Sequence, residues 1–286
     1  MLHPSRKVSE WWFAGDSQMI RRLLGLGAES GEQEGSEPET RSVQSERSEQ
    51  LERLDERRDM STRVLIAYYS TYGHVHQMAD AVEEGASRVS GAEVRVRRFP
   101  ETPAAAEAMA SDENYQSAQR AQEGHPEVTH DDLRWADGII WGTPTRYGNM
   151  AAQMKQFLDT TGSLWQNGEL EDKATGVFTS TATIHGGQET TILTSLVPLI
   201  HLGMVFVGTP YGQNPHILTT EGVGGSPYGP STIADGDGSR QPVEDEFLTA
   251  RNLGERVAHV SCHMSEVRAS RSQGQQPNAP VYTENN

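Results

Sequence analysis

Short apolar runs alternate with segments of helical periodicity over most of the chain. The first run, residues 64–69, is almost continuously apolar, as expected for a strand that is buried on both faces of a sheet. In residues 75–82 the apolar positions recur every three or four residues, which predicts a helix. Residues 93–97 alternate between valine and charged side chains, a pattern typical of a half-exposed edge strand.

The alternation of strand and helix continues to about residue 264. Further strand-like runs occupy residues 138–142, 176–179 and 204–208, and further helical patterns occupy residues 150–158, 192–202 and 243–257. Strands that alternate with helices in this way form a parallel sheet with helices on both faces. The sequence therefore predicts an α/β fold with a doubly wound, five-stranded parallel sheet. Because the second strand has the pattern of an edge strand, the expected order is 2-1-3-4-5.

The composition changes on both sides of this window. Residues 27–59 consist mainly of Glu, Ser, Gln, Arg and Gly, so they cannot bury enough apolar surface to offset the entropy of the chain. We expect residues 1–59 to be a mostly disordered N-terminal extension, or a wrongly assigned start, since Met60 directly precedes the first strand. Residues 265–286 are polar, and we expect a disordered tail. One domain remains, over residues 60–264.

Charge and cysteine content narrow the class of protein. The 286 residues include 24 basic and 40 acidic side chains, a formal net charge of -16, which argues against a protein that binds the phosphates of nucleic acid. The single cysteine, Cys262, cannot form an internal disulfide, and no Cys/His cluster has the spacing of a zinc site, so we expect no metal. No apolar run is long enough to span a membrane, and no signal peptide is recognisable, so we expect a cytoplasmic protein.

A polar loop follows the first strand, at the sheet edge where doubly wound proteins bind ligands. It consists of Ser70, Thr71, Tyr72, Gly73, His74 and Val75, and it leads directly into the first helix. Backbone N–H groups at a helix start, together with hydroxyl donors and a glycine, form a phosphate site. A capped turn without any ligand explains the same residues, because Ser and Thr are good caps. G-x-G-x-x-G does not follow the first strand and G-x-x-x-x-G-K-[ST] occurs nowhere, which excludes a Rossmann site and a P-loop.

Two further polar loops also lead into helices. After the third strand come Thr145, Arg146 and Tyr147, and after the fourth come Ser180, Thr181, Ala182, Thr183, Ile184 and His185. The first of these loops offers a hydroxyl, a cation and an aromatic ring to a flat ligand with polar edges. Since parallel strands end at the same edge of a sheet, the three loops converge. Together they suit a phosphorylated aromatic ring system better than three unrelated helix caps.

Five longer strings resemble one protein family. They are V-L-I-A-Y-Y-S-T-Y-G-H at 64–74, G-T-P-T-R-Y-G-N-M at 142–150, T-G-S-L-W at 161–165, H-G-G-Q-E-T at 185–190 and G-G-S-P-Y-G-P-S-T-I-A-D-G-D-G-S-R-Q-P at 224–242. Over nearly all of residues 62–260 the chain resembles the WrbA family of NAD(P)H:quinone oxidoreductases, flavodoxin-like proteins that bind FMN. The resemblance implies a flavodoxin-like fold, and it implies nothing for the segments outside the match.

The resemblance also implies roles for the three loops. Residues 70–75 are expected to hold the FMN phosphate, residues 145–147 to line the isoalloxazine ring, and residues 180–185 to follow the polar edge of that ring. His201 is expected near the flavin from across a subunit contact. Its apolar helical surroundings alone would equally suit a packed core histidine.

Two aromatic residues are implied to contact substrates. Trp165 is expected to face the substrate space, and Tyr72 to meet the nicotinamide cofactor. The third loop departs from the family pattern, because several members are rich in glycine around Ala182, Ile184 and His185. In the glycine-rich string near the end of the domain, Asp235 and Asp237 are expected to be turn residues.

The activity that the resemblance implies is the two-electron reduction of quinones to hydroquinones at FMN, with NADH or NADPH as the electron donor. The family also implies a homotetramer. Backbone amides after Gly187 are expected to stabilise negative charge on the reduced ring, and His201 or Tyr147 to hydrogen-bond the quinone. One alternative is a flavodoxin-like carrier of single electrons to protein partners, which would not need the long loop 222–242. Another is a flavin-free interaction protein that docks through its N-terminal extension.

Overall fold

Each apolar run predicted from the sequence becomes a strand of one sheet. The computed structural model describes residues 61–274, so the predictions for residues 1–59 and for residues 275–286 lie outside the described residues. The strands are β1 (Thr62–Tyr68), β2 (Ala92–Arg98), β3 (Gly138–Pro144), β4 (Ala174–Thr181), β5 (Val205–Phe206) and β6 (Ser231–Ile233). The helices are α3 (His74–Ala86), α4 (Pro103–Ala108), α5 (Glu113–Ala121), α6 (His130–Trp135), α7 (Ala152–Asp159), α8 (Gly162–Gln166), α9 (Gln188–His201) and α10 (Glu244–Gly274), with a 3-10 turn, η3, at Pro215–Ile217.

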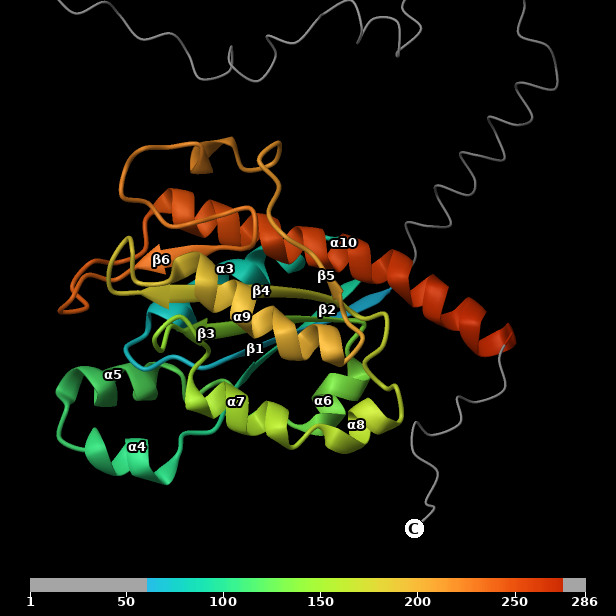
Figure 1. The fold of residues 1–286 in the computed structure, drawn as a ribbon, viewed down its shortest axis with the longest axis horizontal. Coiled ribbons are helices and arrows are strands. Elements are labelled where there is room, and N and C mark those ends of the chain that lie inside the picture. Colours follow the sequence, from blue (N-terminus) through green and yellow to red (C-terminus); the bar gives the residue numbers. More distant parts are fainter. Residues whose placement is uncertain (1–60, 275–286) are drawn as a thin grey trace, which may run out of the picture. The chain divides into compact units, whose positions relative to one another are not determined.

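The strand order β2-β1-β3-β4-β5 confirms the prediction, and the neighbouring strands are parallel. The predicted fifth strand, at residues 204–208, is only two residues long in the structure, however. β5 pairs with β4 only at Ala174 and Thr175, and β6 pairs with the opposite end of β4, from Thr179 to Thr181. The chain between β5 and β6 leaves the sheet and returns to the same edge (Figure 1). β6 is a sixth strand that the sequence pattern did not predict.

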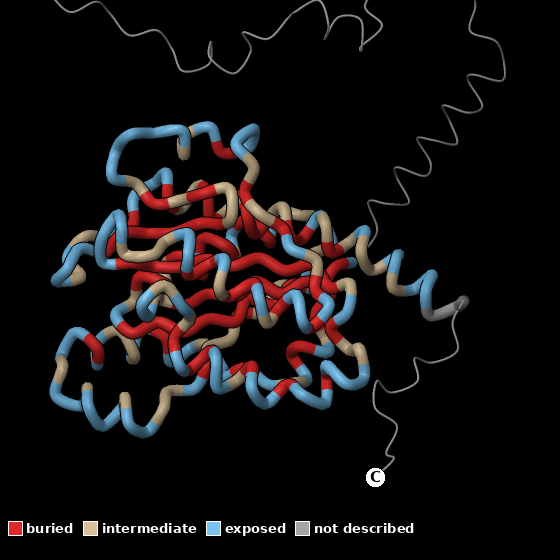
Figure 2. Tube along the Cα trace, viewed as in Figure 1, coloured by how far each residue is buried: buried red, intermediate tan, exposed pale blue. Residues whose placement is uncertain are grey.

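Alternate residues of the central strands point to opposite faces of the sheet, and each face has its own core. On β1, Leu65 and Ala67 pack on the side covered by α6, α7, α8 and α9. Val64 and Ile66 pack on the other side, against α3 and α10. All four side chains are completely buried. Figure 1 shows the two helical layers, and Figure 2 shows the buried strands between them.

The last helix is longer than the pattern predicted. The expected loose tail begins at residue 265, but α10 continues to Gly274, so the predicted domain boundary falls inside a helix. One reason is an ion pair: Nη2 of Arg268 lies 2.7 Å from Oδ1 of Asp137, directly before β3. A segment that docks through charged side chains has no apolar face, so hydrophobic periodicity does not reveal it.

Three short helices lie between β2 and β3, where the pattern predicted none. α4 buries no side chain and α5 buries only Tyr115, so neither has an apolar stripe. Their sequence signals are local instead. Thr102 caps α4, which has Pro103 at its start, and Asp112 caps α5 through the N–H groups of its first turn. α5 bears on function because it forms one wall of the cleft described below.

Two kinds of feature are absent from residues 61–274. None of the helices in this range is both long and apolar enough to cross a bilayer. No group of three or more His, Cys, Asp or Glu side chains in the same range is placed to hold a metal ion.

Candidate functional site

A cleft of about 890 Å³ opens at the carboxyl ends of β1, β3, β4 and β6. Its walls come from four loops and from α5. The lining includes residues 70–77, 144–146, 180–182 and 234–239, with Asp112, Asn114, Ser117, Ala118 and Ala121 on the side of α5. Its volume lies within the range of ~300–1,000 Å³ that is usual for cofactor and ligand sites. The loops predicted after β1, β3 and β4 therefore do meet at one place.

Residues 70–75, which we call the phosphate loop, have the structure of an anion site. Gly73 precedes α3 with φ +94°, a conformation that favours glycine, and no side chain caps this helix start. The first N–H groups of α3 therefore lie uncapped beside the cleft, at the positive end of the helix dipole. Oγ of Ser70 accepts the N–H of Gly73 at 3.1 Å, which closes the turn. Phosphate is a ligand that such a helix start binds well.

The loop after β3 is held by hydrogen bonds from two elements. The N–H of Thr145 donates to the carbonyl of Ser180 at 2.9 Å, and the hydroxyl of Thr191 donates to that of Thr145 at 2.7 Å. The hydroxyl of Thr194 donates to the carbonyl of Gly148 at 2.7 Å. Because Thr191 and Thr194 belong to α9, the loop is locked to both β4 and α9. A loop held in this way need not reorganise when a flat ring binds.

Arg146 connects this loop to the phosphate loop. Its Nη2 donates to Oγ1 of Thr71 at 2.9 Å, and its Nη1 donates to the carbonyl of Thr145 at 2.9 Å. Among the described residues that line the cleft, Arg146 is the only Lys or Arg. Its permanent charge favours an anionic ligand at this side of the cleft.

Some predicted residues do not line the cleft. Tyr147 has φ +54°, and its side chain is fully exposed to solvent. Thr183, Ile184 and His185 are also exposed and lie beyond the lining residues 180–182. Their contacts with the ring therefore stay predictions.

Tyr72 stands at the rim of the cleft and is 47% exposed. Its hydroxyl donates to Oδ2 of Asp112 at 3.1 Å. The other oxygen of Asp112 accepts the N–H groups of Asn114 and Tyr115, as the cap of α5. Tyr72 thus connects the phosphate loop to α5, and its contact with a nicotinamide stays a prediction.

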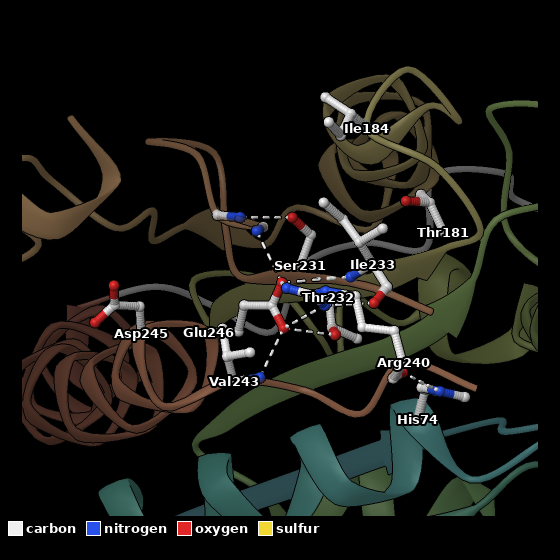
Figure 3. A network of polar contacts seen from close by, with 12 residues as sticks. His74, Thr181, Ile184, Ser231, Thr232, Ile233, Arg240, Val243, Asp245 and Glu246 are labelled. Atoms are coloured by element: carbon white, nitrogen blue, oxygen red, sulfur yellow. Dashed lines mark hydrogen bonds and ion pairs between the residues drawn. The ribbon is translucent and has the colours of Figure 1, made fainter. Parts of the chain in front are cut away.

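A buried carboxylate holds the fourth wall of the cleft in place. Glu246, in the first turn of α10, has no exposed surface. Its two oxygens accept from the guanidinium of Arg240 at 3.0 and 3.2 Å, and from the hydroxyl of Thr232 at 2.8 Å (Figure 3). They also accept the N–H groups of Gly224 at 2.9 Å and of Val243 at 3.0 Å. The buried charge is therefore well paired, as its burial requires.

Arg240 connects the buried carboxylate of Glu246 to the loop that forms this wall of the cleft. Its N–H donates to the carbonyl of Ala234 at 3.1 Å, which closes residues 234–240 into a loop, and the N–H of Ala234 donates to the carbonyl of Thr181 at 2.8 Å. The carbonyl of Arg240 accepts Nε2 of His74 at 2.9 Å. Since a carbonyl only accepts, this nitrogen of His74 carries the hydrogen. The network joins α10, β4 and the phosphate loop.

Sequence reasoning missed two parts of the lining. Asp235 and Asp237 were expected to be turn residues, and the structure places both in the wall of the cleft, with Asp235 at φ +63°. The other missed part is α5, which lines the cleft between Ser117 and Ala121. The long glycine-rich string at 224–242 was a usable signal for the first part, and the cap at Asp112 for the second.

Two histidines next to the cleft share one tyrosine. The hydroxyl of Tyr68 lies 3.0 Å from Nδ1 of His76 and 2.9 Å from Nδ1 of His125. Burial lowers the pKa of both histidines. Burial also raises the pKa of the neighbouring carboxylates Asp80 and Glu83. The group connects β1 and α3 to the segment that follows α5.

We expect acid to destabilise this cluster. The folded-state pKa of each histidine lies below the unfolded value, so the unfolded chain binds more protons as pH falls through about 6.5, and stability is lost there. The free energy of unfolding should fall between about pH 8 and about pH 5.5, and it should fall less in the double variant His76→Gln/His125→Gln. Urea denaturation at both pH values measures this difference. Equal losses in the two proteins would contradict the expectation.

Trp165 and His201 line a second cleft, of about 720 Å³. It is formed by α7, α8 and α9 with their flanking residues, and neither side chain lines the first cleft. The predicted contact of His201 with a flavin therefore requires a second copy of the chain. The roles of both residues stay predictions.

The residues of the first cleft fit FMN. The uncapped start of α3, with the hydroxyls of Ser70 and Thr71, suits the phosphate. The rigid loop at 144–146 and the polar residues 180–182 suit a flat ring with hydrogen-bonding edges. These residues would hold the phosphate and the ring of the group.

The chain is similar in sequence to known proteins of one family. Residues 60–216 match the family described as NADPH-dependent FMN reductase. An NAD(P)H dehydrogenase (quinone) of Geotalea uraniireducens is 51% identical over 205 residues, which are 71% of this chain and 99% of that protein. One of Geobacter sulfurreducens is 52% identical over 204 residues, 71% of this chain and 98% of that protein. A solved structure, the flavodoxin, WrbA-like protein from Agrobacterium tumefaciens, is 26% identical with a TM-score of 0.49 and covers 71% of this chain and 99% of its own.

The match spans almost the whole of each curated relative and most of the residues that the structure describes. The family match at residues 60–216 includes β1 to β5, the phosphate loop and the loop after β3, whose sequences first indicated a cofactor site. The chain therefore belongs to the family of NAD(P)H dehydrogenases (quinone).

Proposed function

We propose that this protein is an FMN-dependent NAD(P)H:quinone oxidoreductase. The observation that carries the proposal is the cleft, in which the loops after β1, β3 and β4 meet beside the start of α3, a helix start that no side chain caps. The chain that forms this cleft is 51% identical to a relative named NAD(P)H dehydrogenase (quinone). When bound, FMN supplies the redox chemistry: it takes a hydride from NADH or NADPH and passes two electrons to a quinone, which takes up two protons.

The chain itself positions the cofactor and sets the local field. Ser70, Thr71 and the first N–H groups of α3 bind the phosphate, and Arg146 adds a positive charge beside them. α9 also begins without a side-chain cap, at Gly187. A Cβ on Gly187 would lie 3.2 Å from Cα of Gly148, so the start of α9 closely approaches the loop after β3. N–H groups at this helix start stabilise negative charge that develops on a ring bound there.

An anaerobic stopped-flow experiment tests the activity. NADH should bleach the FMN-loaded protein, and benzoquinone should restore its colour, with one NADH consumed per quinone reduced. Flavin that binds but does not react with NADH would favour the carrier of single electrons. Failure to bind FMN would favour the interaction protein.

We further propose that the protein forms a homotetramer. α9 exposes an apolar stripe made of Leu193, Val197 and Ile200, which are 41%, 55% and 62% exposed. The stripe adjoins the second cleft, which Val197 and His201 line. Exposed apolar patches of this kind mark contacts between subunits. Assembly through α9 is also what the predicted role of His201 requires.

A charged substitution in this stripe should break the assembly. Val197→Glu/Ile200→Glu is expected to reduce the mass measured by light scattering to that of one or two chains of 31.4 kDa. Val267→Glu is the matched control, because Val267 is also exposed but lies on α10. An unchanged mass in the α9 variant would contradict an interface at this helix.

We also propose a cytoplasmic location. The chain has one cysteine, so it cannot use internal disulfides, which are the usual means of stabilising small proteins in oxidising compartments.

A further inference from the structure

Two glutamines bind the backbone of the phosphate loop: Gln119, which lies in α5, and Gln122, which directly follows this helix. Nε2 of Gln122 lies 3.2 Å from the carbonyl oxygen of Ser70 and 2.8 Å from that of Ala118. Nε2 of Gln119 lies 3.1 Å from the same oxygen of Ser70 and 3.4 Å from the carbonyl oxygen of Thr71. Gln122 is only 2% exposed. Because a carbonyl only accepts, each amide must present its nitrogen to the loop, which determines the orientation of both side chains.

These contacts orient two peptide planes. A trans peptide directs its C=O and its N–H to opposite sides, and none of the described peptide bonds is cis. With the carbonyl of Ser70 held by both glutamines, the N–H of Thr71 points away from them. Gln119 also binds the carbonyl of Thr71, and the N–H of Tyr72 belongs to the same peptide group. This N–H therefore points away from the glutamines as well. Among the residues that the structure describes, neither N–H finds a hydrogen-bond acceptor, and both belong to residues that line the cleft.

We propose that Gln119 and Gln122 are positioning residues for the phosphate of FMN. Neither glutamine is among the residues that line the cleft, so both act through the backbone of the phosphate loop. They direct the N–H groups of Thr71 and Tyr72 toward the same anion that the start of α3 binds. Preorganised donors of this kind bind an anion without a cost of reorientation. The inference rests on the proposed function, since it takes FMN as the ligand of the cleft.

The test compares FMN with riboflavin, which has the same ring and ribityl chain but no phosphate. Gln122→Met and Gln119→Met each remove the amide donor and keep the length of the side chain. Gln153→Met is the matched control, because Gln153 is also buried but its Nε2 donates to Glu101 at 2.5 Å. Quenching of flavin fluorescence in the full-length protein gives the dissociation constants of both flavins.

Each of the two loop variants should bind FMN about tenfold more weakly than the wild-type protein and bind riboflavin as the wild-type protein does. The control should leave the ratio of the two dissociation constants unchanged. The ³¹P resonance of bound FMN should move toward its position in free FMN in the loop variants only. This resonance reports on the phosphate and does not depend on catalytic activity.

Equal losses for FMN and riboflavin would show a general loosening of α5 and would overturn the proposal. Unchanged affinity for FMN in both loop variants would overturn it as well. If Gln122→Met does not fold, Gln119→Met decides, because its side chain is only partly buried. If the wild-type protein binds neither flavin, the proposed function itself fails, and the roles of the glutamines fail with it.

Discussion

Glu246→Ala is expected to lower the free energy of unfolding by about 3–5 kcal/mol and to weaken FMN binding strongly. The substitution leaves Nη2 of Arg240 and the N–H groups of Gly224 and Val243 without their acceptor, and Nη1 of Arg240 keeps only the carbonyl of Ile233. Arg240 then no longer connects the loop at 234–240, which forms a wall of the cleft, to α10. Urea denaturation measures the stability, and titration with FMN measures the affinity.

Asp137→Ala provides the control for this experiment. Asp137 is also a nearly buried carboxylate with two arginine partners, Arg63 at 3.1 Å and Arg268 at 2.7 Å. It directly precedes β3, at the end of the sheet opposite the cleft. We expect a similar loss of stability, of about 3–5 kcal/mol, with little change in the FMN affinity of the folded protein. If Glu246→Ala also kept its FMN affinity, the proposed link from α10 to the cleft would be wrong.

Gly85→Ala should be the other variant with a large effect. A Cβ on Gly85 would lie 1.9 Å from the carbonyl oxygen of Arg251, so α3 and α10 would have to move apart. A Cβ on Gly254, on the facing helix, would likewise lie 2.0 Å from the carbonyl oxygen of Val82. Overpacking of this kind costs about 3 kcal/mol, which lowers the melting temperature by roughly 6–12 °C. FMN affinity should fall too, because α3 carries the phosphate loop at its start.

Gly162→Ala is the matched control, since Gly162 is also helical but a Cβ there would meet nothing within 4 Å. Alanine favours helix more than glycine does, so its melting temperature should be unchanged or slightly higher. Scanning calorimetry of both variants measures the difference. Similar melting temperatures for the two variants would contradict the close packing of α3 against α10.

The order of the sheet could be predicted because the pattern of each strand reports its own burial. The continuous apolar run at 64–69 indicates a strand covered on both faces, and the alternation at 93–97 indicates an edge. β6 escaped prediction because Ser231–Ile233 is too short to show a period. α4 and α5 escaped it because their exposed surfaces carry no apolar stripe.

The phosphate loop could be recognised for a local reason. Ser70 and Thr71 followed by Gly73 and a helix start have the chemistry of an anion site within a few consecutive residues. The supports of that loop are not local. Gln122 binds Ser70 across 52 residues of sequence, and His74 binds Arg240 across 166 residues. No window of sequence contains both partners of such a contact.

From the sequence alone, the fold class, the strand order and the three loops that meet in the first cleft could be predicted, because each strand, helix and loop has its own local pattern. Which side chains line the cleft could not be predicted in this way. In the structure, α5 and residues 234–239 also line the first cleft. The side chain of Tyr147 is exposed to solvent, and His201 lines a second cleft. Burial and side-chain direction follow from the packing of segments that lie far apart in the chain. Hydrophobic periodicity and local motifs do not encode this packing, because each describes only a short stretch of sequence.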